Sequence, residues 1–151
     1  MVPCVMVRNP MKKTRAIISD IDGVLMEGPW FDDIEDFYRE MSSWYPVDWA
    51  VHFVQMFHNL GYKVIFLTAR DERVRLRTEQ QLKDMFDFNI DLYMRGRGDE
   101  RPSCIVKEEH LHDLMEKYDI QLAIDDETPN IKMFQKYGIT TIQVSSKWSN
   151  R

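Results

Sequence analysis

The chain has 151 residues, of which 44% are apolar and 30% are charged. This length fits one ordinary domain, and the composition excludes a disordered or collagen-like chain because the apolar fraction is large enough to build a core. The formal net charge of −5 argues against a uniformly basic surface for nucleic acid, although it leaves room for a local basic patch. We therefore expect a single domain that spans residues 1–151.

The chain opens with an irregular stretch, residues 1–13, which we expect to be a frayed terminus. After it, four short apolar runs rich in Ile and Val are typical of buried strands. These runs are Ala16–Ser19, Val64–Leu67, Leu122–Ile124 and Thr140–Val144. A further strand is expected near Asp91–Met94.

Helical patterns occupy the stretches between the strands. The first is marked by apolar residues at Val47, Ala50, Val51 and Val54, with Pro46 suited to its first turn and Gly61 to its end. Further helices are expected over Glu72–Phe86, around Leu111, Leu114, Met115 and Tyr118, and from Thr128-Pro129 to Gly138. Each predicted helix therefore joins two predicted strands.

Strands that alternate with helices of this length predict right-handed crossovers and a mostly parallel sheet with helices on both faces. We therefore expect a three-layer, Rossmann-like α/β fold. In such folds, ligands bind beyond the carboxyl ends of the strands. The residues that follow each strand are consequently the first candidates for a functional site.

Carboxylates follow two of the predicted strands. Asp20-Ile21-Asp22-Gly23 comes after the first strand, and Asp125-Asp126 comes after Leu122–Ile124. Buried carboxylates are costly unless a cation compensates them, and carboxylate oxygens are the ligands that Mg²⁺ prefers. The sequence therefore predicts a Mg²⁺ site at this edge of the sheet.

Two further residues have the chemistry to hold a phosphate. Thr68 follows the second strand and offers a hydroxyl, and Lys107 offers a point charge suited to phosphate oxygens. Carboxylates, a cation, a hydroxyl and a lysine at one sheet edge suit phosphoryl transfer, in which catalysis consists mostly of positioning and charge stabilisation.

In order along the chain, D-I-D-G-V at Asp20, T-A-R at Thr68, Lys107 and D-D at Asp125 resemble the four motifs of the haloacid dehalogenase (HAD) superfamily of phosphatases. The resemblance implies that Asp20 attacks phosphorus to form an aspartyl-phosphate and that Asp22 acts as general acid and base. It also implies that Thr68 and Lys107 hold the phosphoryl oxygens. Because Asp22 is present, carbon–halogen chemistry is disfavoured.

The same resemblance implies that Mg²⁺ is bound by the carboxylate of Asp20, the backbone carbonyl of Asp22, and Asp125 or Asp126. The sequence leaves the choice between the last two open, with Asp125 preferred. A lone D-x-D also occurs by chance on solvated loops. Here its three partners stand in register at strand ends, which favours the functional reading.

A short segment, residues 26–45, occupies the position where many superfamily members insert a cap domain. It is too short for one, so we expect no substantial cap and an active site open to large substrates. The segment carries five aromatic side chains, Trp30, Phe31, Tyr38, Trp44 and Tyr45. They can stack on bases or pack as a lid or core, and packing is the preferred interpretation.

Three local sequences narrow the resemblance. V-K-E-E at Val106–Glu109, L-A-I-D-D at Leu122–Asp126 and the T-A-R motif resemble the 3'-phosphatase domain of phage polynucleotide kinase-phosphatase. This implies a phosphate-binding role for Arg70, and the alternative is that Arg70 only pairs with Asp71 or Glu72. No G-x-x-x-x-G-K-[ST] motif occurs, so we expect a kinase or ligase to be a separately encoded partner.

Arginines concentrate beside the predicted site. Seven of the eleven arginines lie in the window from Arg70 to Lys107, which carries nine basic and eight acidic residues. Because arginine forks bind phosphates, this window suits a phosphorylated nucleic-acid end or a nucleotide. Arg97 and Arg101, in the loop before Lys107, are candidates for substrate contact, and a merely solvated loop is the alternative.

The sequence thus predicts a Mg²⁺-dependent phosphomonoesterase, with a polynucleotide or nucleotide 3'-phosphatase as the preferred assignment. One alternative is a 5'-nucleotidase or small-molecule phosphatase of the same superfamily, which would use the same residues. Another is a phosphate-binding domain without activity.

The expected location is the cytoplasm. Cys4 and Cys104 lack a C-x-x-C partner, and no apolar run approaches the ~18–20 residues needed to cross a bilayer. The amino terminus also lacks the apolar core of a signal peptide. We therefore expect no membrane association.

Overall fold

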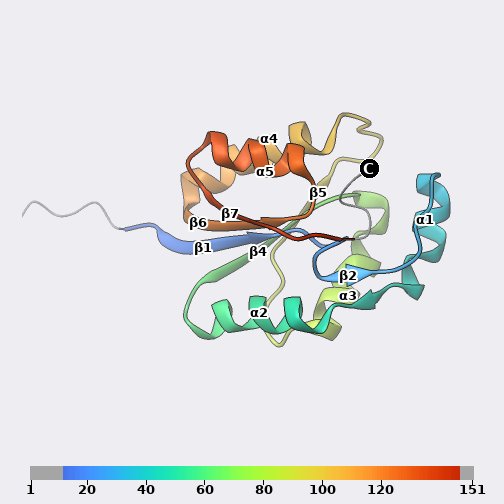
Figure 1. Ribbon diagram of the computed structural model, residues 1–151, viewed down its shortest axis with the longest axis horizontal. Helices are drawn as coiled ribbons and strands as arrows, with labels where there is room; N and C mark the ends of the chain where they lie inside the picture. Colours follow the sequence, from blue (N-terminus) through green and yellow to red (C-terminus); the bar gives the residue numbers. More distant parts are fainter. Residues whose placement is uncertain (1–11, 147–151) are drawn as a thin grey trace, which may run out of the picture.

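The computed structural model describes residues 12–146, and a five-stranded parallel sheet forms their centre (Figure 1). The strands follow the order β5-β4-β1-β6-β7 across the sheet, and every neighbouring pair is parallel. They are β1 (Thr14–Ser19), β4 (Lys63–Asp71), β5 (Leu92–Arg95), β6 (Tyr118–Asp125) and β7 (Thr140–Gln143). The predicted parallel α/β sheet is therefore confirmed.

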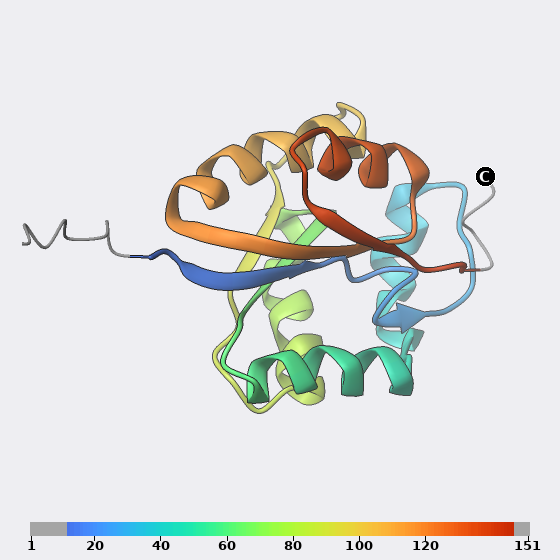
Figure 2. The ribbon, with the colours of Figure 1, turned by 60° about the vertical axis from the view of Figure 1, so that its left-hand side comes forward.

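Helices cover both faces of the sheet. On one face lie α4 (Ser103–Lys117) and α5 (Thr128–Lys136), and on the other lie α2 (Asp48–Asn59) and α3 (Arg75–Met85) (Figures 1 and 2). Each of these helices connects two parallel strands, so all the strands can point the same way. This is the three-layer arrangement that the sequence predicts.

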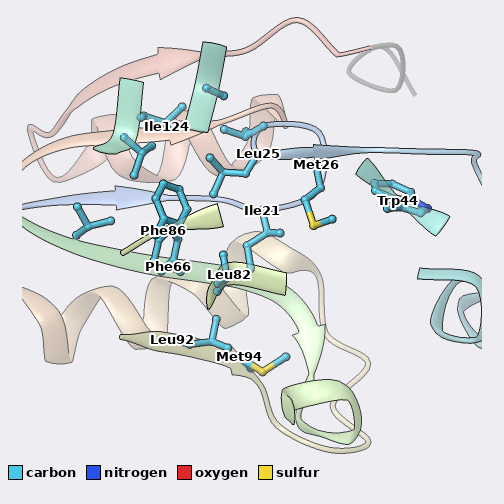
Figure 3. Packing of buried hydrophobic residues seen from close by; sticks show 14 of the residues in the cluster. Ile21, Leu25, Met26, Trp44, Phe66, Leu82, Phe86, Leu92, Met94 and Ile124 are labelled. Atoms are coloured by element: carbon cyan, nitrogen blue, oxygen red, sulfur yellow. The ribbon is translucent and has the colours of Figure 1, made fainter. Parts of the chain in front are cut away.

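The core lies on both sides of the sheet because successive residues of the central strands face opposite layers. In β4, Val64 and Phe66 join the cluster that includes residues of α2 and α3, whereas Ile65 and Leu67 join the cluster with α4 and α5. Figure 3 shows Phe66 beside Phe86, and their ring centroids are 5.3 Å apart. This two-sided burial holds the carboxyl ends of the strands in register.

Several element boundaries differ from those expected, and two of them lie at helix ends. Tyr118 begins β6 instead of extending the third helix, because its backbone is extended and it pairs with Thr14 of β1. Glu72–Val74 forms a separate 3₁₀ turn, η2, ahead of α3. The turn forms because the Asp71 side chain accepts a hydrogen bond from the Arg73 backbone N–H at 2.9 Å.

Residues 26–46 form a small unit for which the sequence carries no periodic signal. It consists of β2 (Met26–Glu27), α1 (Ile34–Glu40), the 3₁₀ turn η1 (Met41–Ser43) and β3 (Tyr45–Pro46), with β2 and β3 antiparallel. Pro46 therefore lies in β3 and not in the first turn of α2. Figure 1 shows α1 beyond the carboxyl ends of the strands. Within residues 12–146, this unit is all that occupies the cap position.

Hydrogen bonds from the end of β4 and from α3 hold the 26–46 unit in place. The Asp71 N–H donates to the Tyr38 hydroxyl at 3.0 Å, and the Arg77 guanidinium donates to the Tyr38 carbonyl at 2.6 Å. The Gln81 amide donates to the Met41 carbonyl at 2.9 Å. These bonds fix α1 and η1 against β4 and α3, so α1 becomes a wall beside the strand ends.

Residues 1–11 and 147–151 lie outside the described part of the chain. Most of the expected frayed terminus, residues 1–13, falls there, as does Cys4. Cys104 is a free, partly buried cysteine. No helix within residues 12–146 is long and apolar enough to cross a membrane.

Candidate active site

A cavity of about 490 Å³ lies between the carboxyl ends of the strands and α1. Six residues that the sequence predicts for the site line it together: Asp20, Asp22, Thr68, Arg70, Lys107 and Asp126. They come from the loop after β1, from β4, from α4 and from the loop after β6. The fold thus brings four separate parts of the chain to one edge of the sheet.

A larger cavity, of about 1050 Å³, lies at the opposite end of the strands, where Thr14, Asp119 and Gly138 line it. Its lining contains one carboxylate and no predicted site residue. Because ligands of parallel α/β sheets bind at the carboxyl ends of the strands, the smaller cavity is the candidate active site.

Lys107 is a buried cation at the bottom of this cavity. Its side chain is 1% exposed, and its Nζ lies 2.7 Å from Oδ2 of Asp125 and 3.1 Å from Oδ1 of Asp20. Burial by itself lowers the pKa of Lys107, but the two carboxylates raise it overall, so the ammonium is charged. The two carboxylates take two of its three N–H donors, so the third can reach a phosphate oxygen in the cavity.

Asp20, Asp125 and Asp126 form a buried carboxylate cluster whose ligand oxygens lie within 4.8 Å of one another. Burial, and then the charge of Asp125, raise the pKa of Asp20 well above its ordinary value, and the same causes raise the pKa of Asp126 to about 6. Three carboxylates against the one ammonium of Lys107 leave two negative charges. An oxygen-liganded divalent cation would neutralise them, so the donor set fits such a metal ion.

Both oxygens of Asp125 are already hydrogen-bonded. Oδ2 accepts from Lys107, the Glu127 N–H donates to Oδ1 at 3.0 Å, and the Asn130 amide donates to both oxygens at 3.1 and 3.2 Å. Asn130 is 1% exposed, and sequence reasoning misses it. The signal that could have found it is a polar residue four positions before Phe134, on the helix face that turns to the sheet.

Asp126 approaches the loop after β1 so closely that only glycine fits there. Gly23 has a φ of +83°, and a Cβ added to it would lie 2.2 Å from Oδ2 of Asp126. The same oxygen accepts a hydrogen bond from the Ser146 hydroxyl at 3.0 Å. Gly23 therefore allows both a sharp turn of the backbone and a close approach to Asp126 that the sequence does not reveal.

Arg70 binds Asp22, which lies 48 residues earlier in the chain. Its Nε and Nη2 donate to the two oxygens of Asp22 at 2.9 and 2.6 Å, and Nη2 also lies 3.8 Å from Sδ of Met26. Nη1 donates to the Thr78 hydroxyl at 3.1 Å and to Oε1 of Gln81 at 2.6 Å. These acceptors take all five N–H donors of the guanidinium. Sequence reasoning misses Thr78 and Gln81, which belong to no motif.

Arg70 does not pair with Asp71 or Glu72, which is the alternative that the sequence leaves open. Asp71 accepts hydrogen bonds from Arg73, and Glu72 accepts them from Arg75. Arg70 is 2% exposed and lines the cavity. Its contact with a phosphate stays a prediction, and it would require one of the five bonds described above to be exchanged.

The two arginines predicted to contact substrate have different surroundings. Arg101 donates to Asp99 at 2.7 Å and to Glu109 at 2.5 Å, and it lies outside the linings of both cavities at this end of the sheet. Arg97 lines a second cavity, of about 600 Å³, which shares Ile34, Tyr38 and Ala69 with the active-site cavity. Arg97 is thus the better placed of the two for a substrate that extends from the site.

Comparisons with known proteins identify relatives of this arrangement. The family model described as the polynucleotide kinase PNKP phosphatase domain matches residues 14–147. A chain in the structure of the Pnkp1/Rnl/Hen1 RNA repair complex is 27% identical, with a TM-score of 0.77 over 87% of this chain and 42% of that one. A chain in a structure of the Pnkp1/Rnl/Hen1 complex is 26% identical, with a TM-score of 0.77 over 89% of this chain and 47% of that one. This chain therefore spans less than half the length of these two relatives.

The fold also occurs in a more distant enzyme. The class C acid phosphatase from Bacillus anthracis with tungstate bound is 13% identical, with a TM-score of 0.65 over 90% of this chain and 68% of that one. At this level of identity, the likeness concerns the fold alone.

The crowding of carboxylates predicts that Asp126→Asn stabilises the metal-free protein. In the presence of a chelator at pH 7.5, we expect the variant to gain roughly 2–3 kcal/mol in free energy of unfolding, because the burial of the Asp126 charge and its repulsion with Asp125 are removed. Urea denaturation measures this difference, and Asp113→Asn, at an exposed position on α4, is the matched control.

The gain should depend on pH in a defined direction. Above about pH 6, Asp126 is ionised in the folded and the unfolded protein, so the folded state carries the full cost of the buried charge and its repulsion with Asp125. Below about pH 4 both states hold the proton, and the advantage of the variant should vanish. An advantage that is absent at pH 7.5, or that grows as the pH falls, would contradict the carboxylate cluster as described.

Proposed function

This chain belongs to the family of polynucleotide kinase PNKP phosphatase domains and is a phosphatase of the HAD superfamily, and from this premise we propose that it removes 3'-phosphates from nucleic-acid ends or nucleotides. One observation carries the proposal. Asp20 lies beside the buried ammonium of Lys107 at the bottom of a cavity in which Arg70 holds Asp22. This arrangement supports Asp20 as the nucleophile, Lys107 as the phosphate-binding cation and Asp22 as the proton donor.

In the first step, Asp20 attacks the phosphorus atom. A bond forms between a carboxylate oxygen of Asp20 and phosphorus while the bond from phosphorus to the 3'-oxygen breaks. The leaving 3'-oxygen takes a proton from Asp22. Lys107 and the Thr68 hydroxyl hold the phosphoryl oxygens, where preorganised donors stabilise developing charge.

In the second step, water hydrolyses the aspartyl-phosphate. Asp22 takes a proton from the water, whose oxygen bonds to phosphorus while the bond to Asp20 breaks. Inorganic phosphate leaves, and the carboxylate of Asp20 is restored. Because Arg70 binds both oxygens of Asp22, it fixes where the proton is delivered and collected, so we assign Arg70 as a positioning residue in addition to its predicted contact with phosphate.

Mg²⁺ is the cation we assign to the carboxylate cluster. Asp20, Asp126 and the backbone carbonyl of Asp22 would hold it, and when bound it supplies positive charge to the phosphoryl oxygens. Asp126 is preferred over Asp125 as a ligand because the oxygens of Asp125 already accept four hydrogen bonds. In this assignment Asp125 positions Lys107.

The relatives in the Pnkp1/Rnl/Hen1 RNA repair complex support a setting in nucleic-acid repair. We assign this chain a place beside a kinase or ligase activity, which prepares or seals the ends whose 3'-phosphate it removes. A 5'-nucleotidase would use the same catalytic residues, so the substrate assignment depends on direct comparison.

Competition between substrates tests the proposal. At matched concentrations, we expect a 3'-phosphorylated oligonucleotide and a 3'-mononucleotide to be hydrolysed in preference to a 5'-mononucleotide and a sugar phosphate. Asp20→Asn should lower kcat on the best substrate by about a thousandfold or more, because it removes the nucleophile. A chelator should abolish activity, and added Mg²⁺ should restore it.

Asp113→Asn again serves as the control, and the free energy of unfolding of each variant shows that the fold is intact. A preference for the sugar phosphate would overturn the nucleic-acid assignment. Near-normal turnover by Asp20→Asn would overturn the aspartyl-phosphate, and full activity in the chelator would overturn the metal assignment.

The bond between Arg70 and Asp22 predicts an effect that depends on the leaving group. Arg70→Lys should lower kcat on a 3'-phosphorylated oligonucleotide by roughly a hundredfold, because a displaced Asp22 delivers its proton poorly to an alkoxide. The loss on p-nitrophenyl phosphate should be much smaller, since p-nitrophenolate leaves without a proton. Steady-state kinetics on both substrates measures the difference.

Arg75→Lys is the matched control, because Arg75 is paired with Glu72 and lies outside the linings of both cavities at this end of the sheet. Equal losses of kcat on the two substrates would indicate that Arg70 binds the phosphate directly and does not act through Asp22.

The different surroundings of Arg97 and Arg101 predict different effects. Arg97→Ala should lower kcat/KM on an oligonucleotide by about three- to tenfold and reduce the slope of its salt dependence by about one. A 3'-mononucleotide, which does not extend to the second cavity, should be unaffected. Arg101→Ala is the control, and losses of the same size in both variants would contradict a specific role for Arg97.

A further inference from the structure

The lining of the active-site cavity includes apolar side chains that the hydrolysis does not need. Trp30, Phe31 and Ile34 line the same cavity as Asp20 and Thr68. Trp30 is 48% exposed and Ile34 is 53% exposed, although both are large apolar side chains. Exposed apolar surface beside a polar site commonly marks a surface for a ligand.

The structure separates these residues from the other aromatic side chains of the same segment. Tyr38 and Trp44 are buried, and the Tyr38 hydroxyl is hydrogen-bonded to the backbone at Asp71. Phe37 packs edge-to-face against Trp44, with ring centroids 5.0 Å apart. These three residues pack in the core, as the preferred sequence interpretation expects, whereas Trp30 and Ile34 keep about half of their surface exposed.

Trp30, Phe31 and Ile34 form an apolar wall of the cavity, and hydrogen bonds within the protein hold this wall in place without a ligand. Nε1 of Trp30 donates to Oδ1 of Asp32 at 2.9 Å, and the Asp33 side chain caps the first turn of α1 by accepting from the Glu35 N–H at 2.9 Å. The Glu35 carboxylate in turn lies 2.6 Å from Nη1 of Arg73. Binding of a ligand to this apolar wall therefore costs the protein little conformational entropy.

We propose that Trp30 and Ile34 bind the nucleobase of the nucleotide whose 3'-phosphate is removed, which rests on the function proposed above. In that nucleotide the phosphate and the base are attached to the same ribose. With the phosphate at Asp20 and Lys107, the base lies within reach of the neighbouring wall. An aromatic surface of this kind binds every base through its π-face, so the site accepts different terminal bases.

The neighbouring cavity favours a strand end over other aromatic phosphates. It adjoins the active-site cavity at Ile34, Tyr38 and Ala69, and Arg97 lines it. A strand that places its last base against Trp30 and Ile34 can continue there, with the next phosphate near Arg97. A phosphotyrosine side chain has no second phosphate for that cavity.

The test compares two 3'-phosphorylated oligonucleotides that differ only in whether the terminal nucleotide carries a base. We expect wild-type protein to show a kcat/KM about tenfold or more higher for the oligonucleotide with the base. Trp30→Ala should abolish this ratio, Trp30→Phe should retain part of it, and Ile34→Ala should reduce it. Trp49→Ala is the matched control, because Trp49 is 55% exposed on α2 and lies outside the cavity.

A binding measurement gives a second readout without turnover. In the Asp20→Asn background, a terminal 2-aminopurine should be quenched on binding, and the quenching should be lost when Trp30→Ala is added. A phosphotyrosine peptide is included as a competing substrate.

The possible failures are distinguishable. If wild-type protein hydrolyses both oligonucleotides equally, the base site is overturned while the 3'-phosphatase assignment stands. If neither oligonucleotide is a substrate, or if the phosphotyrosine peptide is preferred, both proposals are overturned. An equal loss of the ratio in Trp49→Ala would assign the effect to general destabilisation and overturn the base site as well.

Discussion

The structure of the site depends on one buried charge, the ammonium of Lys107 between Asp20 and Asp125. These three residues come from α4, from the loop after β1 and from β6, so a single contact joins a helix layer to two central strands. Removing one member of a buried ion pair leaves an uncompensated charge, which typically costs several kcal/mol. The contact that prepares the proposed phosphate site therefore also holds the sheet and the layer of α4 and α5 together.

A second ion pair, between Arg70 and Asp22, connects the site to the opposite helix layer. Arg70 is held by Thr78 and Gln81 of α3, and the other end of the Gln81 amide holds the carbonyl of Met41. The loop after β1, strand β4, helix α3 and the 26–46 unit are thus linked by consecutive hydrogen bonds. The position of Asp22 and the position of the apolar wall consequently depend on the same few contacts.

The residue types and their order predict the sheet, its helices and the gathering of Asp20, Asp22, Thr68 and Lys107, because short buried strands with polar ends carry strong periodic and chemical signals. The 26–46 unit could not be predicted this way. Its helix has seven residues and one buried side chain, so it leaves no apolar stripe. The partner of Arg70 could not be predicted either, because Asp71 and Glu72 are its neighbours in the sequence, whereas Asp22 is its neighbour only in the folded structure. For the same reason, the sequence does not distinguish Arg97 from Arg101, and only the fold shows that Arg97 lines a cavity and Arg101 does not.

The order of the strands has a consequence for the growing chain. β1 is synthesised first but lies at the centre of the sheet, where its neighbours are β4 on one side and β6 on the other. On the ribosome, one edge of this apolar strand stays unpaired until residues near Asp125 have emerged, and an exposed strand edge invites pairing with other chains. The nascent protein therefore carries Asp20 and Asp22 long before Asp125 and Asp126 can join them.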